Sequence, residues 1–281
     1  MLPWRSDDGA GRRPDRLPLP GARMPLVRGG RPLKRWRYVG VFGPSAMACV
    51  GFVRVGGVPQ AWWAIWQREA GWLRERTIFA RPAGAVRFAP GAVTVRDGDC
   101  AIDLAVDEIP GVETVCRDGA QYVWTRKQAA VAVRGTARIA GEEVVLGGLG
   151  VVDDTAGYHD RHTEWRWSAG VGRLGDGRAV GWNLVTGVND PPARSERSVW
   201  VDGVAHEVGP VIFDAGLRGV GFAEDGHALR FRREATRERH DELLAMRSDY
   251  VQPFGTFSGA LPGAGELAEG FGVMEWHRAR W

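Results

Sequence analysis

Residues 36–58 read WRYVGVFGPSAMACVGFVRVGGV, and residues 165–188 read WRWSAGVGRLGDGRAVGWNLVTGV. Both stretches open with Trp-Arg and an aromatic residue, and both continue into a Val-Gly-aromatic motif with similarly spaced valines and glycines. Three further matches follow in the same order along the chain: Val86-Arg-Phe88 with Val220-Gly-Phe222, Gln128 with Gln252, and Leu149-Gly-Val151 with Phe271-Gly-Val273. Because the matches keep one order, they indicate a duplicated domain.

The residues between these matches indicate strands. Short runs of Val, Phe, Trp, Thr and Leu alternate with Gly, Pro and Asp-Gly, as at Asp97-Gly98 and Asp202-Gly203. Asp-Gly supplies the positive φ angles of tight hairpin turns. We therefore predict an all-β protein with two tandem antiparallel β-barrel or curved-sheet domains. A closed sheet loses its exposed edges, and a barrel of about eight strands leaves room for one small ligand.

The same pattern sets the expected domain limits. Residues 1–32 are rich in Pro, Gly and Arg, show no strand or helix period, and are expected to form an extended arm in which Met24 is an alternative start. The first domain is expected over 33–160 and the second over 161–281, with a ligand cleft between them. The one helix that the pattern permits covers 233–247, which reads equally well as a charged β edge or loop.

Composition excludes several classes of protein. The chain has 281 residues, with 37 Lys+Arg against 34 Asp+Glu, and its positive charge is nearly all arginine scattered among acids. A nucleic-acid partner is not expected, because such proteins gather their charge on one face. The longest uncharged stretch, Tyr38 to Val53, is interrupted by glycine and proline and is too short to span a membrane. We expect a cytoplasmic protein, since the N-terminus lacks a signal pattern.

The three cysteines, Cys49, Cys100 and Cys116, form no C-x-x-C pair. This spacing argues against a disulfide scaffold and a zinc ribbon. A metal site built from His159, Asp160 and His162 with Glu275 or His277 is a rival possibility. The H-D-x-H spacing is not a specific ligand motif, and we expect neither a metal nor an organic cofactor.

The densest polar segment, residues 153–165, falls at the junction of the two copies, and 275–281 is its counterpart at the end of the second. In an extended chain, alternate residues share a face, so Tyr158, Asp160 and His162 would point one way and His159 the other. Carboxyl and imidazole groups in an apolar, Trp-lined pocket suit general acid/base chemistry. The alternative is a solvated linker with salt bridges.

Thirteen tryptophans also need an explanation. Most are expected in the core, as is usual in β proteins, and a few are expected to line a cavity. Trp165 and Trp167 are candidates for that second group. Asn183 and Gln252 are candidate hydrogen-bonding partners of a ligand, although each could simply cap a strand.

The stretch from Pro25 to Trp281 resembles a bacterial family known only as a domain of unknown function. The resemblance rests on these motifs: Lys34-Arg-Trp36-Arg-Tyr38, Gly157-Tyr158-x-Asp160, Trp165-x-Trp167, Asn183-Leu184, Gly187, Gln252-x-x-Gly255 and Glu275-Trp-His277-x-Ala-x-Trp281. More remotely the chain is similar to tandem lipocalin-like proteins of the AttH and hydroxyneurosporene synthase (carotenoid hydratase) type, and to lipocalin-like cyclases. In that group a Tyr-His-Asp-His or Trp-x-Asp-x-Glu-Trp string ends the first domain, and residues 158–165 match its beginning and end, with two added residues between.

The resemblance implies lipocalin-like domains and the hydration, isomerisation or cyclisation of a hydrophobic small molecule. In that case Asp160 would be the general acid and His159 or His162 its partner, with Glu275 and His277 as polar groups of the second copy. Tyr158, Trp165, Trp167, Asn183 and Gln252 would bind the ligand. The alternative is a lipid- or metabolite-binding protein without catalysis.

Overall fold

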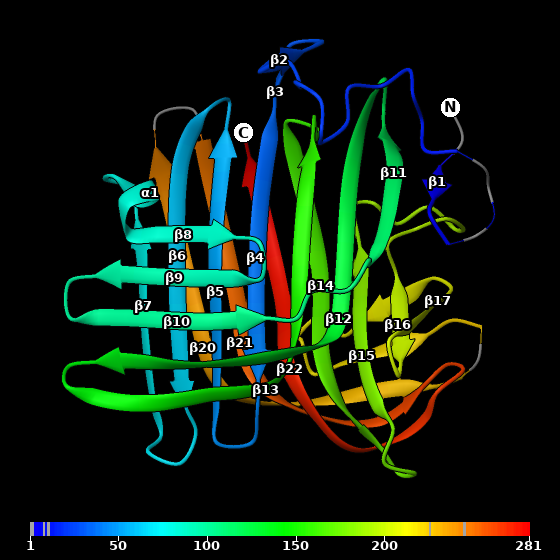
Figure 1. Ribbon diagram of the computed structural model, residues 1–281. Coiled ribbons are helices and arrows are strands. Elements are labelled where there is room, and N and C mark those ends of the chain that lie inside the picture. The colour runs from blue at the N-terminus through cyan, green and yellow to red at the C-terminus, as the bar shows by residue number, and fades with distance from the viewer. Residues whose placement is uncertain (1–2, 8, 10–11, 225, 244–245) are drawn as a thin grey trace.

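The computed structural model describes residues 3–7, 9, 12–224, 226–243 and 246–281. Two large antiparallel sheets contain nearly all of its strands (Figure 1). The first has the order β7 (Trp72–Ile78), β6 (Val58–Gln67), β5 (Ala46–Val55), β4 (Lys34–Phe42), β13 (Glu142–Gly157), β12 (Gln121–Ile139), β10 (Cys100–Val106), β9 (Ala92–Asp97) and β8 (Val86–Ala89). A side branch joins β11 (Val112–Asp118) to β12 and to β1 (Trp4–Arg5).

The second sheet repeats this order. It consists of β17 (Val204–Glu207), β16 (Ser198–Val201), β15 (Ala179–Thr186), β14 (His162–Leu174), β22 (Gly265–Arg280), β21 (Met246–Leu261), β20 (Ala228–Leu243), β19 (Gly219–Phe222) and β18 (Val211–Phe213). The predicted duplication is therefore confirmed strand by strand, with β4 equivalent to β14 and β13 to β22. Of the sequence matches, only Val86-Arg-Phe88 falls one strand away from its proposed partner, on β8 rather than β9, the strand equivalent to β19.

Each sheet curls over its own apolar core. Val50 and Ile65 on one part of the first sheet pack in the same cluster as Val95 and Ile102, because β8–β10 lie across β5–β7 (Figure 1). The bend follows from the long strands, and in β12 it coincides with a bulge at Ala130, whose φ is 56°. Such a bulge increases local twist and bends the strand. The result is a half-barrel in each copy, which corresponds to the curved-sheet form of the two predicted β domains.

A third core joins the two half-barrels. Along β4, Val39 and Val41 enter the first core, whereas Tyr38 and Phe42 pack against the second sheet. Tyr38 meets Trp167 edge to face, with ring centroids 5.5 Å apart. Gly181 of β15 lies so close to the β12 bulge that a Cβ atom there would come 2.6 Å from the amide nitrogen of Ala130. A side chain at this position would push the two sheets apart.

The turns are those that the sequence predicts. Asp202 and Gly203 join β16 to β17 with φ angles of 48° and 82°, which is the pattern of a type I′ hairpin. The described residues of 233–247 form strands and not the permitted helix, because β20 and β21 pair with each other there; residues 244–245 lie outside the described residues. Some of its charges pair within that hairpin, as in the ion pairs of Arg239 with Asp241 and Arg247 with Asp249, whereas Arg237 pairs with Glu75 of β7. The only helix among the described residues is α1 (Pro82–Ala85).

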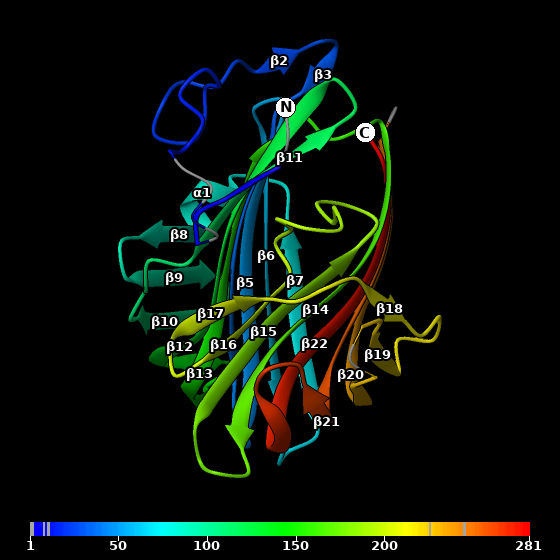
Figure 2. The same ribbon diagram turned by 90° about the vertical axis from the view of Figure 1, so that its right-hand side faces the viewer.

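The arm is more ordered than its composition indicated. It crosses the upper end of the molecule and carries β1 and the hairpin of β2 (Val27–Arg28) with β3 (Arg31–Pro32) (Figures 1 and 2). Leu19 of the arm is buried in a small apolar cluster over the first sheet. The first sheet's strands end at Gly157 and the second sheet begins at His162, and we propose that the domains divide between them, at 160/161. No helix in the described part of the chain is long and apolar enough to cross a membrane.

Candidate functional site

A pocket of about 460 Å³ lies where the two sheets meet, and we call it the junction pocket. Its walls come from the end of β11, the crossing segment between β13 and β14, the loop after β15, and the arm. They are mostly polar and consist of Pro3, Cys116, Arg117, Asp118, His159, Asp160, His162, Thr163, Glu164, Gly187, Val188, Asn189, Asp190 and Pro191. Three of the sequence-predicted residues, His159, Asp160 and His162, are therefore brought together here.

His159 is the buried member of this set. Its side chain stacks on Trp36 with ring centroids 5.1 Å apart, and the residue is only 2% exposed. Neither ring nitrogen has a hydrogen-bond partner, which is unusual for buried polar atoms. Burial, together with the charges of Lys34 and Lys127, lowers the pKa of His159 to about 3. The imidazole is therefore neutral at physiological pH, with one N–H donor and one lone pair free for a ligand.

Asp160 and His162 lie at the exposed rim of the pocket. The Asp160 side chain is 58% exposed and forms an ion pair of 3.3 Å with Arg31. Tyr158 points away from the pocket, because its ring packs under the arm and its hydroxyl donates to the Pro25 carbonyl at 2.9 Å. The simple alternation expected for 158–162 fails because β13 ends at Gly157 and the crossing segment is not a strand.

The second-copy residues form a separate cluster inside the interface. Glu275 accepts hydrogen bonds from Trp165 Nε1 at 2.7 Å and from Gln252 Nε2 at 2.8 Å. Burial raises the pKa of Glu275 to about 7 against the opposing effect of these donors. The carboxyl group is thus close to half protonated near neutral pH, the condition under which a group can either give or take a proton.

The remaining predicted residues lie around this cluster. Trp167 donates through Nε1 to Asn183 Oδ1 at 2.8 Å, and Asn183 donates in turn to the carbonyl of Glu196 at 3.0 Å. The His277 ring lies 4.2 Å from that of Trp165, and its Nε2 is 2.8 Å from Ser248 Oγ. Burial lowers the pKa of His277 to about 3. These side chains contact one another through hydrogen bonds and ring packing, and none of them lines the junction pocket.

Three charged residues that the sequence did not single out connect the two clusters. Lys127 Nζ lies 2.5 Å from Asp153 Oδ1 on the first sheet and 3.4 Å from Glu196 Oε1 on the second-sheet side. Burial alone would lower the pKa of Lys127, but the two carboxylates outweigh it and raise that pKa. Glu196 also accepts a hydrogen bond from Asn189, a wall residue of the junction pocket, at 3.3 Å.

The amino-acid composition itself points to these buried charges, through the rarity of lysine. Lys34 and Lys127 are the only lysines in the sequence, and both are buried. Lys34 donates to the carbonyl of His159 at 3.0 Å, and burial lowers its pKa to about 8. The two lysines of an otherwise arginine-based chain are thus both buried near His159, where Arg31 is a third cation. Among the described residues, no group of three or more His, Cys, Asp or Glu is placed to hold a metal ion.

The raised pKa of Glu275 predicts a pH-dependent stability. The unfolded chain releases this proton near pH 4.5 and the folded chain near pH 7, so the free energy of unfolding falls as the pH rises between these values. The expected loss is about 3 kcal/mol. Urea unfolding of the wild type and of Glu275→Gln across this range measures it, since every other titrating group is common to both proteins. Parallel stability curves for the two proteins would contradict the assignment.

Two duplicated, curled antiparallel sheets packed against each other, with a pocket at their junction, define a tandem lipocalin-like β protein. The family described as Domain of unknown function (DUF2804) matches residues 96–281, and the chain belongs to this family. No curated protein matches the chain.

Three similar solved structures can be compared with the chain. Kievitone hydratase from Nectria haematococca is 9% identical, with 86% of this chain and 88% of that chain covered and a TM-score of 0.56. A Nitrosomonas europaea protein described as an AttH is 14% identical, with 92% and 97% covered and a TM-score of 0.49. CghA in complex with Sch210972 is 11% identical, with 88% of each chain covered and a TM-score of 0.42. The similarity to kievitone hydratase, whose TM-score is above 0.5, supports the fold.

Proposed function

We propose that the chain binds a small molecule in the junction pocket and converts it by acid/base chemistry, with His159 as the group that exchanges a proton with the substrate. The observation that carries this proposal is the state of His159: buried, neutral, on the wall of a pocket, and without a partner at either ring nitrogen. A substrate hydroxyl or carbonyl would supply the missing hydrogen bond. A buried polar group without such a partner costs about 1–3 kcal/mol.

The neutral imidazole suits hydration or isomerisation. In isomerisation, the lone pair of the imidazole takes a proton from one substrate carbon, and the imidazolium returns it to another carbon. The product therefore has the same atomic composition as the substrate. In hydration, the lone pair takes a proton from water as the oxygen bonds to one alkene carbon, and the proton passes to the neighbouring carbon. The low pKa makes the imidazolium a strong acid, which favours the return of the proton. It also makes the neutral imidazole a weak base, so the proton that His159 takes must come from an activated position, such as a carbon next to a carbonyl group. The fold shared with a protein named as a hydratase is compatible with this class of reaction.

The pocket walls indicate what such a substrate carries. Val188, Pro191 and Pro3 offer apolar contact to its body, whereas Asp160 and His162 at the rim face its polar end. Because His159 already returns the proton in this scheme, the carboxylate of Asp160, which is paired with Arg31, would orient the polar end of the substrate instead of acting as the general acid. Glu275 and His277, with Trp165, Trp167, Asn183 and Gln252, would then stabilise the sheet junction behind the pocket.

The test compares wild type with His159→Gln on a metabolite extract, followed by untargeted mass spectrometry. We expect the wild type to deplete one compound and form a product of equal mass or one that differs by a single water. His159→Gln retains hydrogen-bonding ability but cannot cycle a proton, so its rate should fall about 10²- to 10⁴-fold. His206→Gln is the matched control, because His206 is exposed on β17 outside the pocket.

Unchanged turnover in His159→Gln, with the thermal midpoint of the variant equal to that of the wild type, would remove His159 from the mechanism. A compound that co-purifies with the wild type but is never converted would favour the alternative, a metabolite-binding protein without catalysis.

A further inference from the structure

A second pocket, of about 450 Å³, lies on the first sheet away from the junction pocket. Its floor is formed by β4, β12 and β13, and the arm forms part of its wall through Arg13 and Pro20. We call it the arginine pocket, and its lining is Arg13, Pro20, Arg35, Trp36, Arg37, Glu113, Trp124, Arg126, Asp154 and Thr155. Neither the sequence motifs nor the proposed reaction accounts for four arginines in one concave surface.

Most of these positive charges are neutralised within the protein. Arg37 lies 2.7 Å from Asp154 and 2.6 Å from Glu108, and Arg126 lies 2.9 Å and 3.3 Å from the same two acids. Two cations thus share two carboxylates and form a rigid, electrically balanced floor. Fixed ion pairs of this kind position guanidinium groups without supplying net charge.

Arg13 is balanced as well. Its Nε donates to Glu113 Oε2 at 2.8 Å, and the same carboxylate oxygen accepts from Trp124 Nε1 at 2.9 Å. The Arg13 guanidinium also lies over the Trp124 ring, 6.0 Å from its centroid. The arm is therefore attached to the first sheet at this wall, with its cation already paired.

Arg35 is the arginine of this lining that has no acidic partner among the described residues. Its side chain is exposed, and no hydrogen bond or ion pair joins it to any described residue. Two residues further along β4, the Nε of Arg37 is buried and has no hydrogen-bond acceptor. The four arginines of the lining, with Asp154, Glu113 and Glu108 as their acidic partners, leave one positive charge, and an anionic group would neutralise it.

We infer that the arginine pocket binds a small organic anion, with its carboxylate or phosphate group held by Arg35. The volume of the pocket exceeds what a bare inorganic anion fills, so the ligand has an organic body that rests against the Pro20 and Trp124 wall. The site is separate from the junction pocket, because the two pockets share no lining residue. Trp36 lies between them, since it belongs to the lining of the arginine pocket and its ring stacks on His159.

The experiment titrates the full chain with benzoate, phenyl phosphate, inorganic phosphate and neutral benzamide, followed by the NMR signals of the tryptophan indole N–H groups. We expect benzoate or phenyl phosphate to bind more tightly than benzamide and inorganic phosphate, and the tighter of the two identifies the acidic group. Arg35→Gln should weaken that binding about tenfold, because it removes one charge-assisted contact.

Arg230→Gln is the matched control, since Arg230 is an exposed arginine of the second sheet and its loss changes the net charge equally. It should leave the affinity within twofold of the wild type. The inference is overturned if benzamide binds as well as benzoate and phenyl phosphate. It is also overturned if neither anion binds, or if Arg230→Gln weakens binding as much as Arg35→Gln.

Discussion

Replacing Lys127 by methionine is expected to lower the free energy of unfolding by about 3–5 kcal/mol, the cost of leaving buried charges without their partner. Lys127 is 3% exposed, and Asp153 and Glu196 on either side of it are 8% and 2% exposed. Without the ammonium group, two carboxylates from opposite sides of the sheet junction would face each other in a site with little water. Equilibrium unfolding in urea at neutral pH measures the loss.

Lys34→Met is the matched control for Lys127→Met. Lys34 is equally buried, but it donates to the backbone carbonyl of His159 and lies over the Trp281 ring, 4.7 Å from its centroid, instead of bridging two carboxylates. Its replacement should cost about 1–2 kcal/mol, the value of an ordinary buried hydrogen bond. Adding Glu196→Gln to Lys127→Met should restore part of the stability, because it removes one of the two unpaired charges. If the two lysine variants lose equal stability, the bridge contributes nothing specific.

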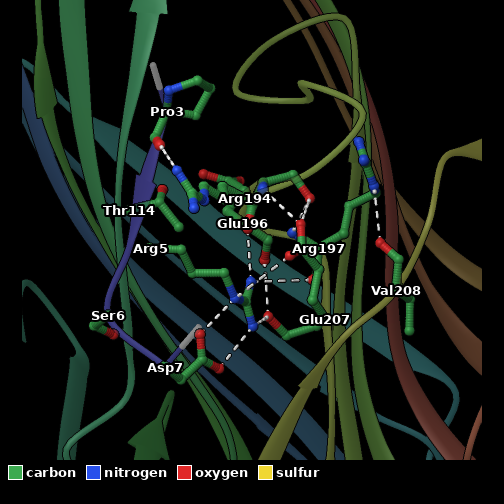
Figure 3. Close-up of polar contacts among 12 residues, drawn as sticks. Pro3, Arg5, Ser6, Asp7, Thr114, Arg194, Glu196, Arg197, Glu207 and Val208 are labelled. Atoms are coloured by element: carbon green, nitrogen blue, oxygen red, sulfur yellow. Dashed lines mark hydrogen bonds and ion pairs between the residues drawn. The ribbon is translucent and has the colours of Figure 1, made fainter. Parts of the chain in front are cut away.

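Replacing Arg5 by alanine is expected to cost about 3 kcal/mol, because its buried guanidinium group makes hydrogen bonds that hold the arm to the second sheet. Arg5 is 1% exposed and donates to the Ser195 carbonyl at 2.6 Å, the Arg197 carbonyl at 3.3 Å and Ser198 Oγ at 3.1 Å (Figure 3). Its Nε also lies 2.5 Å from Asp7. Alanine would remove the donor that the buried Ser195 carbonyl accepts from, whereas the Arg197 carbonyl keeps the Val208 N–H and Ser198 Oγ keeps the Glu196 carbonyl. Hydrogen exchange should show faster amide exchange over 187–198.

Arg13→Ala serves as the comparison, since the ion pair of Arg13 with Glu113 is partly exposed and such pairs contribute about 0–1 kcal/mol. Removal of residues 1–23 should destabilise the chain more than Arg5→Ala does, because it also removes the buried Leu19. If Arg5→Ala leaves both the stability and the amide exchange over 187–198 unchanged, Arg5 does not hold the arm to the second sheet.

The arm shows why sequence patterns were least informative for residues 1–32. Composition indicated an extended arm without regular periodicity, and Arg5 was not distinguishable from any other residue of an arginine-rich segment. Its burial depends on β1 pairing with β11 of the first sheet, which directs the side chain to a loop of the second. No local pattern encodes a contact between residues 5 and 195.

In the candidate site, too, some residues lie where the sequence pattern places them and others do not. The polar string at the copy junction identified His159, Asp160 and His162, which share the junction pocket, because the chain crosses between the sheets at that point. The string also grouped Tyr158 with them, by an alternation rule that holds only within a strand. Glu275 was expected near the same residues but lies in its own cluster with Trp165 and Gln252, because β22 carries it into the sheet interface.

The sequence by itself determined the strands, their turns and the duplication. These depend on local properties: side-chain alternation with a period of two, positive φ angles at Asp-Gly pairs, and an ordered series of repeated motifs. Only the tertiary structure decided which buried charges meet, as in Lys127 with Glu196 and Arg5 with the Ser195 loop. Such contacts join residues far apart in the chain, and their geometry is set by how each sheet curls and how the two sheets pack together.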